Sequence, residues 1–323
     1  MSDKKMRFRM DFVQEIISVD EDKRTFTVRL IPNPRRYEWK EIDGKRYLYD
    51  KLDNILFFPE KVFFDLVKQM VGQPIYFQPQ EIDNAEQYVK SRIPSIRARL
   101  RGDEKPATFE DKSEAFLESL AQDKLGFVIM CVDIVGSTKL SINLDLKKYT
   151  KLISTVLYEI GEIVPKFHGH VLKYTGDGLI AYFPEPSFIT KNDLAIDCAL
   201  TIRRLVYSGL NPIFKENGYP CIDIRIGLDS GEACVVTIGS PETKQHKDII
   251  GAVVSLAAKI QSLGKPGDIL LGDITVRNLH TMWREICEEL KIGENWVYKG
   301  EDGKPYKVHK IKFGYVPTSP NSG

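Results

Sequence analysis

The hydrophobic positions in the second half of the chain predict strands and helices that alternate. Residues 127–132 form a continuous apolar run of strand length. After it, apolar residues recur at steps of three and four over residues 149–164, which places them on one face of a long helix. The runs at residues 170–174 and 179–183 flank the turn Thr175-Gly176-Asp177-Gly178 and therefore predict a β-hairpin with an acid at its tip.

The same alternation continues toward the C-terminus. We expect a helix over residues 193–207 and then two strands, at 222–228 and 233–238, joined by a turn at Asp229-Ser230-Gly231. A helix at 253–261 and a strand at 268–271 follow. This order of elements predicts an α+β fold, a sandwich in which helices pack on a mainly antiparallel sheet.

Shorter patterns in the first hundred residues predict a small α+β domain. Strand-like runs lie at residues 25–31, 47–49 and 74–77, and an apolar stretch at 62–71 has helical character. A length of 323 residues accommodates two domains. We therefore expect a small α+β domain of unknown role over residues 1–105, a linker helix over 106–123 and a second domain over 124–323.

Composition argues against several classes of partner. The 46 basic and 45 acidic residues leave a formal charge of +1, which gives no general attraction to nucleic acid or to a membrane. Five basic side chains between residues 90 and 101 fit a solvated face or linker better than an RNA site. The five cysteines show no C-x-x-C spacing, and no stretch approaches about 18 consecutive apolar residues. We expect a cytoplasmic protein with no nucleic-acid partner and no membrane partner.

Asp133 and Asp177 are candidate metal ligands. Asp133 follows the strand predicted at 127–132, and Asp177 lies at the tip of the hairpin that would be its neighbour in the sheet. Two carboxylates at one rim repel each other unless a cation intervenes, and Mg²⁺ and Mn²⁺ prefer oxygen ligands supplied together with substrate phosphates. The pair therefore predicts two divalent metal ions acting on a triphosphate.

The small-residue turn after Asp133 is a candidate phosphate site. Gly136, Ser137 and Thr138 stand where a strand passes into a helix, and backbone N–H groups at a helix amino terminus bind phosphate. Each feature also has an ordinary structural interpretation, in which Asp133 and Thr138 cap the helix and Asp177 serves a turn that favours Asp-Gly. The order of elements between the two acids favours the metal site.

Four segments, in this order and spacing, resemble the class III adenylate and guanylate cyclases over about residues 124–315. They are Val132-Asp133-Ile134-Val135-Gly136-Ser137-Thr138, Leu172-Lys173-Tyr174-Thr175-Gly176-Asp177-Gly178, Arg225-Ile226-Gly227-Leu228-Asp229-Ser230-Gly231-Glu232 and Asp248-Ile249-Ile250-Gly251. The resemblance implies that a ribose 3′-hydroxyl attacks the α-phosphate of a nucleoside triphosphate, which releases pyrophosphate and a 3′,5′-cyclic nucleotide. It also implies a homodimer whose active sites are shared between the subunits.

The resemblance assigns roles to individual residues. Asp133 and Asp177 would hold the two metal ions, Mn²⁺ or Mg²⁺, with the carbonyl of Ile134 completing the second site. Lys173 and Asp248 match the two positions that read the base, and Lys is the residue of adenylate cyclases, where guanylate cyclases carry Glu. A surface Lys and an Asp before a turn are the ordinary interpretations of this pair.

Two positions depart from the family pattern. Where the family shows Asn and, four residues later, Arg, which orient the ribose and stabilise the transition state, this chain has Ser255 and Lys259. Lys keeps the charge of Arg but not the planar fork that clamps phosphate. A well-placed cationic clamp is worth roughly 10³ to 10⁵ in rate, so we expect low activity, compensation by other residues or a different position of the substrate. Lys299 matches a lysine that binds the triphosphate.

Lys173 and Asp248 leave the identity of the base open. Adenine and cytosine each offer an amino donor beside a ring-nitrogen acceptor, and uracil offers the complementary carbonyl and N–H. Ser255, Lys259 and the unassigned amino-terminal domain resemble the pyrimidine cyclases of bacterial Pycsar anti-phage systems. That resemblance implies cyclic UMP, ahead of cyclic CMP, as a second messenger in antiviral defence that a separate effector protein reads.

Two alternatives stay open. An adenylate cyclase would make cyclic AMP from ATP, because Lys173 and Asp248 match that class. A catalytically inactive cyclase fold that serves as a nucleotide-binding or dimerisation module would account for Ser255 and Lys259. The retention of both Asp133 and Asp177 speaks against the inactive module, since a binding module has less need of two metal ligands.

Overall fold

The computed structural model describes residues 10–20, 25–70, 80–103, 112–120, 124–184, 191–293, 295–300 and 302–313. The chain forms two compact units. The first comprises Met1–Pro79 with His280–Met282, and the second comprises Gln80–Leu279 with Trp283–Gly323. The strand expected at residues 74–77 lies outside the described residues.

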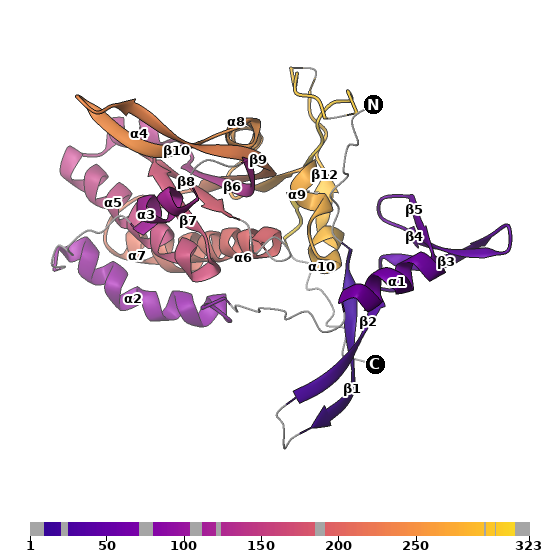
Figure 1. The fold of residues 1–323 in the computed structure, drawn as a ribbon. Coiled ribbons are helices and arrows are strands. Elements are labelled where there is room, and N and C mark those ends of the chain that lie inside the picture. Colours follow the sequence, from indigo (N-terminus) through magenta and orange to yellow (C-terminus); the bar gives the residue numbers. More distant parts are fainter. Residues whose placement is uncertain are drawn as a thin grey trace. The chain divides into compact units, whose positions relative to one another are not determined.

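An eight-stranded sheet is the centre of the second unit (Figure 1). Its order is β12-β13-β11-β9-β6-β8-β7, and β10 pairs with β9 outside this path. The strands are β6 (Lys124–Ile134), β7 (His170–Tyr174), β8 (Gly178–Phe183), β9 (Ile224–Ser240), β10 (Lys244–Ile250), β11 (Ile269–Gly272), β12 (Cys287–Glu289) and β13 (Val308–Ile311). All pairs are antiparallel except β9 with β11, which confirms the predicted mainly antiparallel sheet.

Helices accompany the sheet in the order that the hydrophobic pattern predicted. The predicted helix at 149–164 lies within α5 (Leu146–Ile163) and the 3-10 turn after it, and the one at 253–261 lies within α8 (Ala252–Leu263). The remaining helical elements are α2 (Ala85–Arg101), α3 (Lys112–Ser119), α4 (Ser137–Asn143), α6 (Lys191–Arg204), a π-helical turn (Leu205–Leu210), α7 (Asn211–Glu216), α9 (Asp273–Arg277) and α10 (Thr281–Glu285). None of the helices in the described ranges is long and apolar enough to cross a membrane.

Strand β6 divides the core into two halves by the alternation of its side chains. Val128, Met130 and Val132 pack in the cluster that contains the apolar faces of α2, α5 and α6. Phe127 and Ile129 pack on the other side, in the cluster that contains α3 and α8. Because successive side chains of a strand point to opposite faces, the odd-numbered residues of β6 share the face of α8.

Helix α2 belongs to the second unit, although the sequence pattern placed residues 1–105 in one domain. Its residues Val89, Ile96 and Leu100 are buried in the core beside α5 and α6. Arg92 donates from Nε and Nη2 to the fully buried carboxylate of Glu159, at 2.8 and 2.9 Å. The division between the two units therefore falls after Pro79, because the apolar and ionic contacts of α2 lie with α5.

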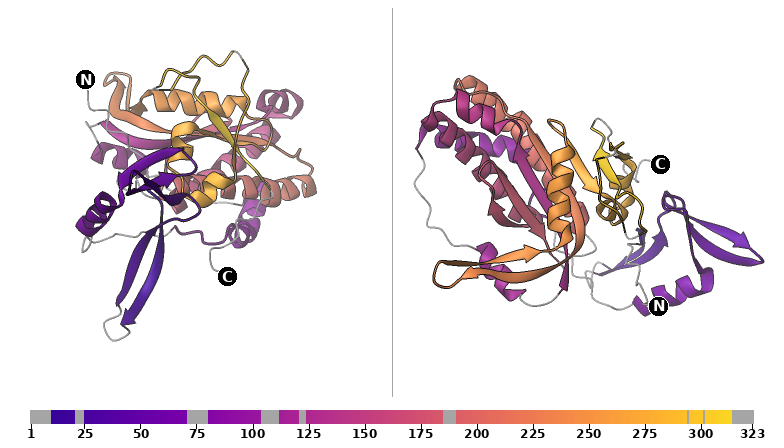
Figure 2. Two further views of the ribbon diagram at one scale, coloured as in Figure 1. Left: turned by 90° about the vertical axis from the view of Figure 1, so that its right-hand side faces the viewer. Right: turned by 90° about the horizontal axis from the view of Figure 1, so that it is seen from above.

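The turn predicted at Asp229-Ser230-Gly231 is wrong. These residues lie inside the single 17-residue strand β9, where Asp229 pairs with Ile129 and Gly231 pairs with Phe127 of β6. The turn of the hairpin comes after Ser240, and β10 then returns along the distal half of β9. This hairpin extends beyond the ends of the strands beside it (Figure 2). Tertiary pairing overrides the turn preference of Asp and Gly here.

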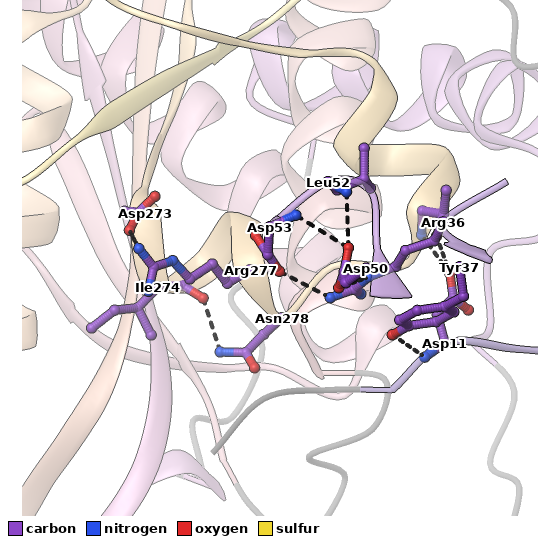
Figure 3. A network of polar contacts seen from close by, with 11 residues as sticks. Asp11, Arg36, Tyr37, Asp50, Leu52, Asp53, Asp273, Ile274, Arg277 and Asn278 are labelled. Atoms are coloured by element: carbon purple, nitrogen blue, oxygen red, sulfur yellow. Dashed lines mark hydrogen bonds and ion pairs between the residues drawn. The ribbon is translucent and has the colours of Figure 1, made fainter. Parts of the chain in front are cut away.

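The first unit is a small α+β assembly of two sheets and one helix. Strands β1 (Phe12–Asp20) and β2 (Thr25–Pro32) form one sheet, β3 (Tyr37–Ile42), β4 (Lys45–Asp50) and β5 (Ile55–Pro59) form the other, and α1 (Glu60–Met70) follows. Arg36 is fully buried before β3 and donates to Asp50 at 2.8 Å and to Asp53 at 3.1 Å (Figure 3). A buried guanidinium requires such partners, so this ion pair constrains the chain around β3 and β4.

The buried acid in the middle of β9 predicts a pH-dependent stability. Asp229 is 1% exposed and accepts a hydrogen bond of 2.6 Å from the hydroxyl of Tyr306, and burial raises the pKa of its carboxyl to about 7. A carboxyl with a raised folded-state pKa stabilises the fold below its unfolded pKa of about 4, and this stabilisation is lost as the pH rises toward 7.

We therefore expect the free energy of unfolding to fall more between about pH 4 and pH 7 in the wild type than in Asp229→Asn, which keeps an acceptor for Tyr306 and cannot ionise. Urea titrations across this range measure the difference. An equal dependence on pH in the two proteins would contradict the account.

Candidate active site

The candidate site begins where β6 ends. Asp133 stands opposite Gly178 of β8 and Arg225 of β9. Asp177 immediately precedes Gly178, and its carbonyl accepts a hydrogen bond of 3.3 Å from the amide of Ile134. The structure thus brings the two predicted acids to the same rim of the sheet. The amide of Ile134, the last residue of β6, joins the two segments through its hydrogen bond to Asp177.

Gly178 allows this close approach of β8 to β6. A Cβ at position 178 would lie 2.3 Å from the carbonyl oxygen of Val132 and 3.3 Å from the Cα of Asp133. Both of these neighbours are backbone atoms, which cannot move aside as the end of a flexible side chain can. A side chain at this position would therefore push Asp177 away from Asp133.

Arg225 and Gln261 hold the carboxylate of Asp133. Arg225 donates from Nε and Nη2 to Oδ2 of Asp133, at 3.0 and 2.9 Å, and Gln261 donates to the same oxygen at 3.2 Å. The side chains of Asp133 and Arg225 are 24% and 30% exposed, so solvent and substrate can reach the pair. Asp133 therefore bonds to β9 and α8 and does not cap α4.

The position of Gln261 depends on a second close approach. A Cβ at Gly227 of β9 would lie 2.3 Å from the amide nitrogen of Gln261 and 2.6 Å from the carbonyl oxygen of Ala257. Glycine at 227 thus lets α8 lie directly on β9, which brings Gln261 to Asp133. Sequence reasoning missed Arg225 and Gln261 as site residues, although Arg225 begins one of the four family-like segments and Gln261 ends a predicted helix.

Ser137 holds the second acid. Its hydroxyl donates to Oδ2 of Asp177, and the residue is the first of α4 and is largely buried. Gly136 precedes it with a left-handed backbone (φ 72°), and both Gly136 and Thr138 are exposed. Of the three phosphate-binding residues predicted in this turn, Ser137 therefore contacts a candidate metal ligand, and Gly136 and Thr138 are exposed beside it.

Lys173 and Asp248 form a second cluster. Lys173 of β7 donates from Nζ to Oδ2 of Asp248 in β10 at 2.6 Å, and their side chains are 42% and 9% exposed. A cavity of about 420 Å³ opens beside the pair. Its lining is Ser113, Glu114, Leu117, Leu172, Lys173, Tyr174, Lys244, His246, Lys247 and Asp248. The structure therefore joins the two predicted base-reading residues at one pocket.

Helix α3 closes one side of this pocket. Ser113 donates to the carbonyl of Val171 in β7 at 2.6 Å, and the amide of Lys247 in β10 donates to Glu114 at 3.3 Å. The helix thus bonds to both strands that carry the pair. No hydrogen bond or ion pair within the described ranges joins Lys173 or Asp248 to Asp133 or Asp177.

The three remaining predicted residues are exposed. Ser255 and Lys259 stand one turn apart on α8, so they share one face of that helix. Lys299 pairs with Pro305 in an isolated β-bridge, in a segment that Tyr306 anchors to the buried Asp229. The structure describes no hydrogen bond or ion pair between these residues and Asp133 or Asp177.

The donor set at the rim fits hard divalent cations. The described residues contain no group of three or more His, Cys, Asp and Glu side chains that could enclose a metal ion by themselves. Two carboxylates and neighbouring backbone oxygens are the ligands that Mg²⁺ and Mn²⁺ prefer when substrate phosphates complete the coordination. The residues present are therefore suited to metal ions that arrive with a triphosphate.

Several proteins with similar sequences are named as nucleotide cyclases. The chain matches the family described as adenylate and guanylate cyclase catalytic domain over residues 121–306. It is 28% identical to a cytidylate cyclase from Escherichia coli over 189 residues, which cover 56% of this chain and 39% of that protein. It is 26% identical to an adenylate cyclase from Anabaena cylindrica over 207 residues, which cover 61% of this chain and 37% of that protein. The chain thus spans about two fifths of the length of these curated relatives.

A solved structure shares the fold. The adenylyl cyclase CyaB from P. aeruginosa superposes with a TM-score of 0.52 at 22% sequence identity, covering 61% of this chain and 98% of that chain. Identity this low shows the fold alone. It confirms the predicted cyclase-like sandwich for the second unit.

The contact of Gly178 with backbone atoms predicts a stability effect. Gly178→Ala inserts a methyl group against the carbonyl of Val132, and overpacking of this kind costs about 1–3 kcal/mol. Gly293→Ala is the matched control, because a Cβ at that position meets nothing within 4 Å. Thermal denaturation is expected to show a lower melting temperature for Gly178→Ala alone, and equal melting temperatures would refute the close approach.

Proposed function

Because the chain belongs to the family of adenylate and guanylate cyclase catalytic domains, we propose that it converts a pyrimidine nucleoside triphosphate to its 3′,5′-cyclic monophosphate. The observation that carries the cyclase activity in this proposal is the juxtaposition of Asp133 and Asp177 at one rim of the sheet. In the reaction the 3′-oxygen forms a bond to the α-phosphorus, the bond from that phosphorus to the bridging oxygen breaks, pyrophosphate leaves and the hydroxyl proton is released.

Asp133, Asp177 and the carbonyl of Ile134 are the groups that would hold two divalent metal ions. Such ions, when bound, lower the pKa of the 3′-hydroxyl and neutralise charge on the phosphates. Arg225 supports this role because its guanidinium compensates the charge of Asp133 when no metal is bound and provides a positive charge beside incoming phosphate. The hydroxyl of Ser137 orients the carboxylate of Asp177 through its hydrogen bond to Oδ2.

The other predicted residues complete the proposed site. Gly136, Ser137 and Thr138 would offer N–H and hydroxyl groups to phosphate, and Lys299 would offer a cation. Ser255 and Lys259 share an exposed face of α8 and would orient the ribose and stabilise the transition state. Lys259 presents a point charge in place of a planar fork, which leads us to expect a modest turnover.

We place the base at the pocket of Lys173 and Asp248. The proposal is supported by the 2.6 Å ion pair in the lining of a cavity of about 420 Å³, a size within the usual range for small-molecule sites. The absence of bonds between this pair and the acids, within the described residues, favours a homodimer in which one subunit binds the metal ions and the other reads the base. Two such sites would form in each dimer.

The pyrimidine assignment has support from relatives, since proteins named cytidylate cyclase from Escherichia coli and Staphylococcus aureus are similar to this chain. We further propose, from the likeness to Pycsar cyclases, that the cyclic product is a second messenger in anti-phage defence that a separate effector reads. The second candidate is an adenylate cyclase. It is favoured by the Anabaena cylindrica relative and by the fit of Lys173 and Asp248 to the amino group and ring nitrogen of adenine.

A mixing experiment tests the shared site. Asp133→Ala removes a metal ligand and Lys173→Ala removes a base-reading group, so each variant alone should lose nearly all activity. A heterodimer of the two carries one intact site, and random assembly should recover about a quarter of the wild-type rate of pyrophosphate release.

The matched control mixes Asp133→Ala with Asp177→Ala. Both substitutions lie in the same half-site, so no heterodimer of this pair has an intact site and no recovery is expected. Circular dichroism confirms that each variant is folded. A mixture of Asp133→Ala and Lys173→Ala that stays inactive would show that the proposed division of the site between subunits is incorrect.

A further inference from the structure

His246 stands beside the proposed base-reading pair. It lies on β10 two residues before Asp248, and residues two apart on a strand point to the same face. His246 also lines the same pocket as Lys173 and Asp248. Nothing in the family resemblance gives this residue a role, and the inference that follows rests on the proposed function.

Asp248 has one oxygen that faces both neighbours. Its Oδ1 accepts a hydrogen bond of 2.8 Å from the amide of Ile249, which fixes the carboxylate plane. Its Oδ2 lies 2.6 Å from Nζ of Lys173 and 3.9 Å from Nε2 of His246. Oδ2 is thus the common neighbour of two nitrogen atoms that come from different strands.

The imidazole of His246 presents a donor at Nε2. Its Nδ1 is buried and has no hydrogen-bond partner among the described residues. A carboxylate beside Nε2 favours the neutral tautomer with the proton on that nitrogen, and a protonated imidazole also carries a proton there. In both forms the pocket therefore displays a donor from Lys173, an acceptor from Asp248 and a donor from His246.

This pattern matches the pairing edge of one base. Uracil offers a carbonyl at C4, an N–H at N3 and a carbonyl at C2, which is acceptor, donor and acceptor. Cytosine offers an amino group, a ring-nitrogen acceptor and a carbonyl. Its carbonyl can accept from His246, but its amino donor meets the donor of Lys173 and its ring nitrogen meets the acceptor of Asp248, unless Lys173 and Asp248 exchange partners. Adenine has only a C–H at the third position, and guanine has an amino donor there, which opposes the donor of His246.

We propose that His246 is the third base-reading residue, that it donates to the C2 carbonyl of a pyrimidine, and that the row Lys173, Asp248, His246 selects uracil. UTP is then the substrate. Without a bound base, Lys173 and Asp248 compensate each other's charge in their ion pair. When uracil binds, its C4 carbonyl accepts from Lys173, its N3–H donates to Asp248 and its C2 carbonyl accepts from His246.

Steady-state kinetics of the full chain with Mn²⁺ test the role of His246. For the wild type we expect kcat/KM to be highest for UTP, lower for CTP and lowest for ATP and GTP. His246→Ala should lower kcat/KM for UTP about tenfold or more, because the C2 carbonyl loses its donor, and should leave kcat/KM for ATP within about twofold. Gln245→Ala is the matched control, since this exposed neighbour on β10 does not line the pocket and should leave the preference unchanged.

The analogue 2-thio-UTP isolates the proposed contact. Sulfur at C2 is a weak hydrogen-bond acceptor, so the wild type should prefer UTP to 2-thio-UTP, whereas His246→Ala should treat the two alike. Equal treatment by the wild type, or an unchanged ratio of UTP to ATP in His246→Ala, would overturn the role of His246. A wild type that prefers CTP or ATP to UTP would overturn the choice of uracil while the cyclase proposal stands. Absence of any cyclic product from the wild type would instead overturn the proposed function.

Discussion

Two carboxylates held at the same rim of a sheet repel each other, and the arrangement of the second unit depends on the compensation of that charge. Asp133 ends the central strand β6, and Asp177 stands next to it because Gly178 lets two backbones meet closely. Arg225 neutralises Asp133 through two hydrogen bonds, and Ser137 donates to Asp177. Groups of the chain itself thus compensate the charge of Asp133 and hold Asp177, which supports the proposal that their oxygens receive metal ions together with a triphosphate.

The packing of the core decides where these groups lie. The side chains of β6 alternate between the helices α2, α5 and α6 on one face and α3 and α8 on the other. Asp133, an odd-numbered residue, therefore shares a face with α8, and the close contact at Gly227 brings Gln261 to it. The same face carries α3, which bonds to β7 and β10 beside the pocket of Lys173 and Asp248. Packing on the two faces of β6 thus links the proposed metal ligands to the proposed base pocket.

The sequence predicted most of the fold of the second unit because its apolar residues form runs of strand length, as in β8, or recur at helical steps, as in α5. It failed at Asp229 to Gly231, because turn-forming residues were recruited into the long strand β9, where Asp229 bonds to Tyr306 from a distant segment. It also placed α2 with the first domain, because the partners of that helix are seen only in the folded chain, where its apolar face packs beside α5 and Arg92 pairs with the buried Glu159. Motifs made Asp133 and Asp177 candidate metal ligands, and that role stays a prediction. Motifs did not point to Arg225, Gln261 or His246, because their contacts with Asp133 and Asp248 form only in the folded chain.

The most direct test of the central claim is to identify the product. Purified protein is incubated with Mn²⁺ and, separately, with UTP, CTP, ATP and GTP, and the products are resolved by chromatography and mass spectrometry. Our account predicts pyrophosphate and a 3′,5′-cyclic pyrimidine monophosphate, with cyclic UMP as the main product. A cyclic purine nucleotide as the sole product, or no cyclic nucleotide from any triphosphate, would contradict it.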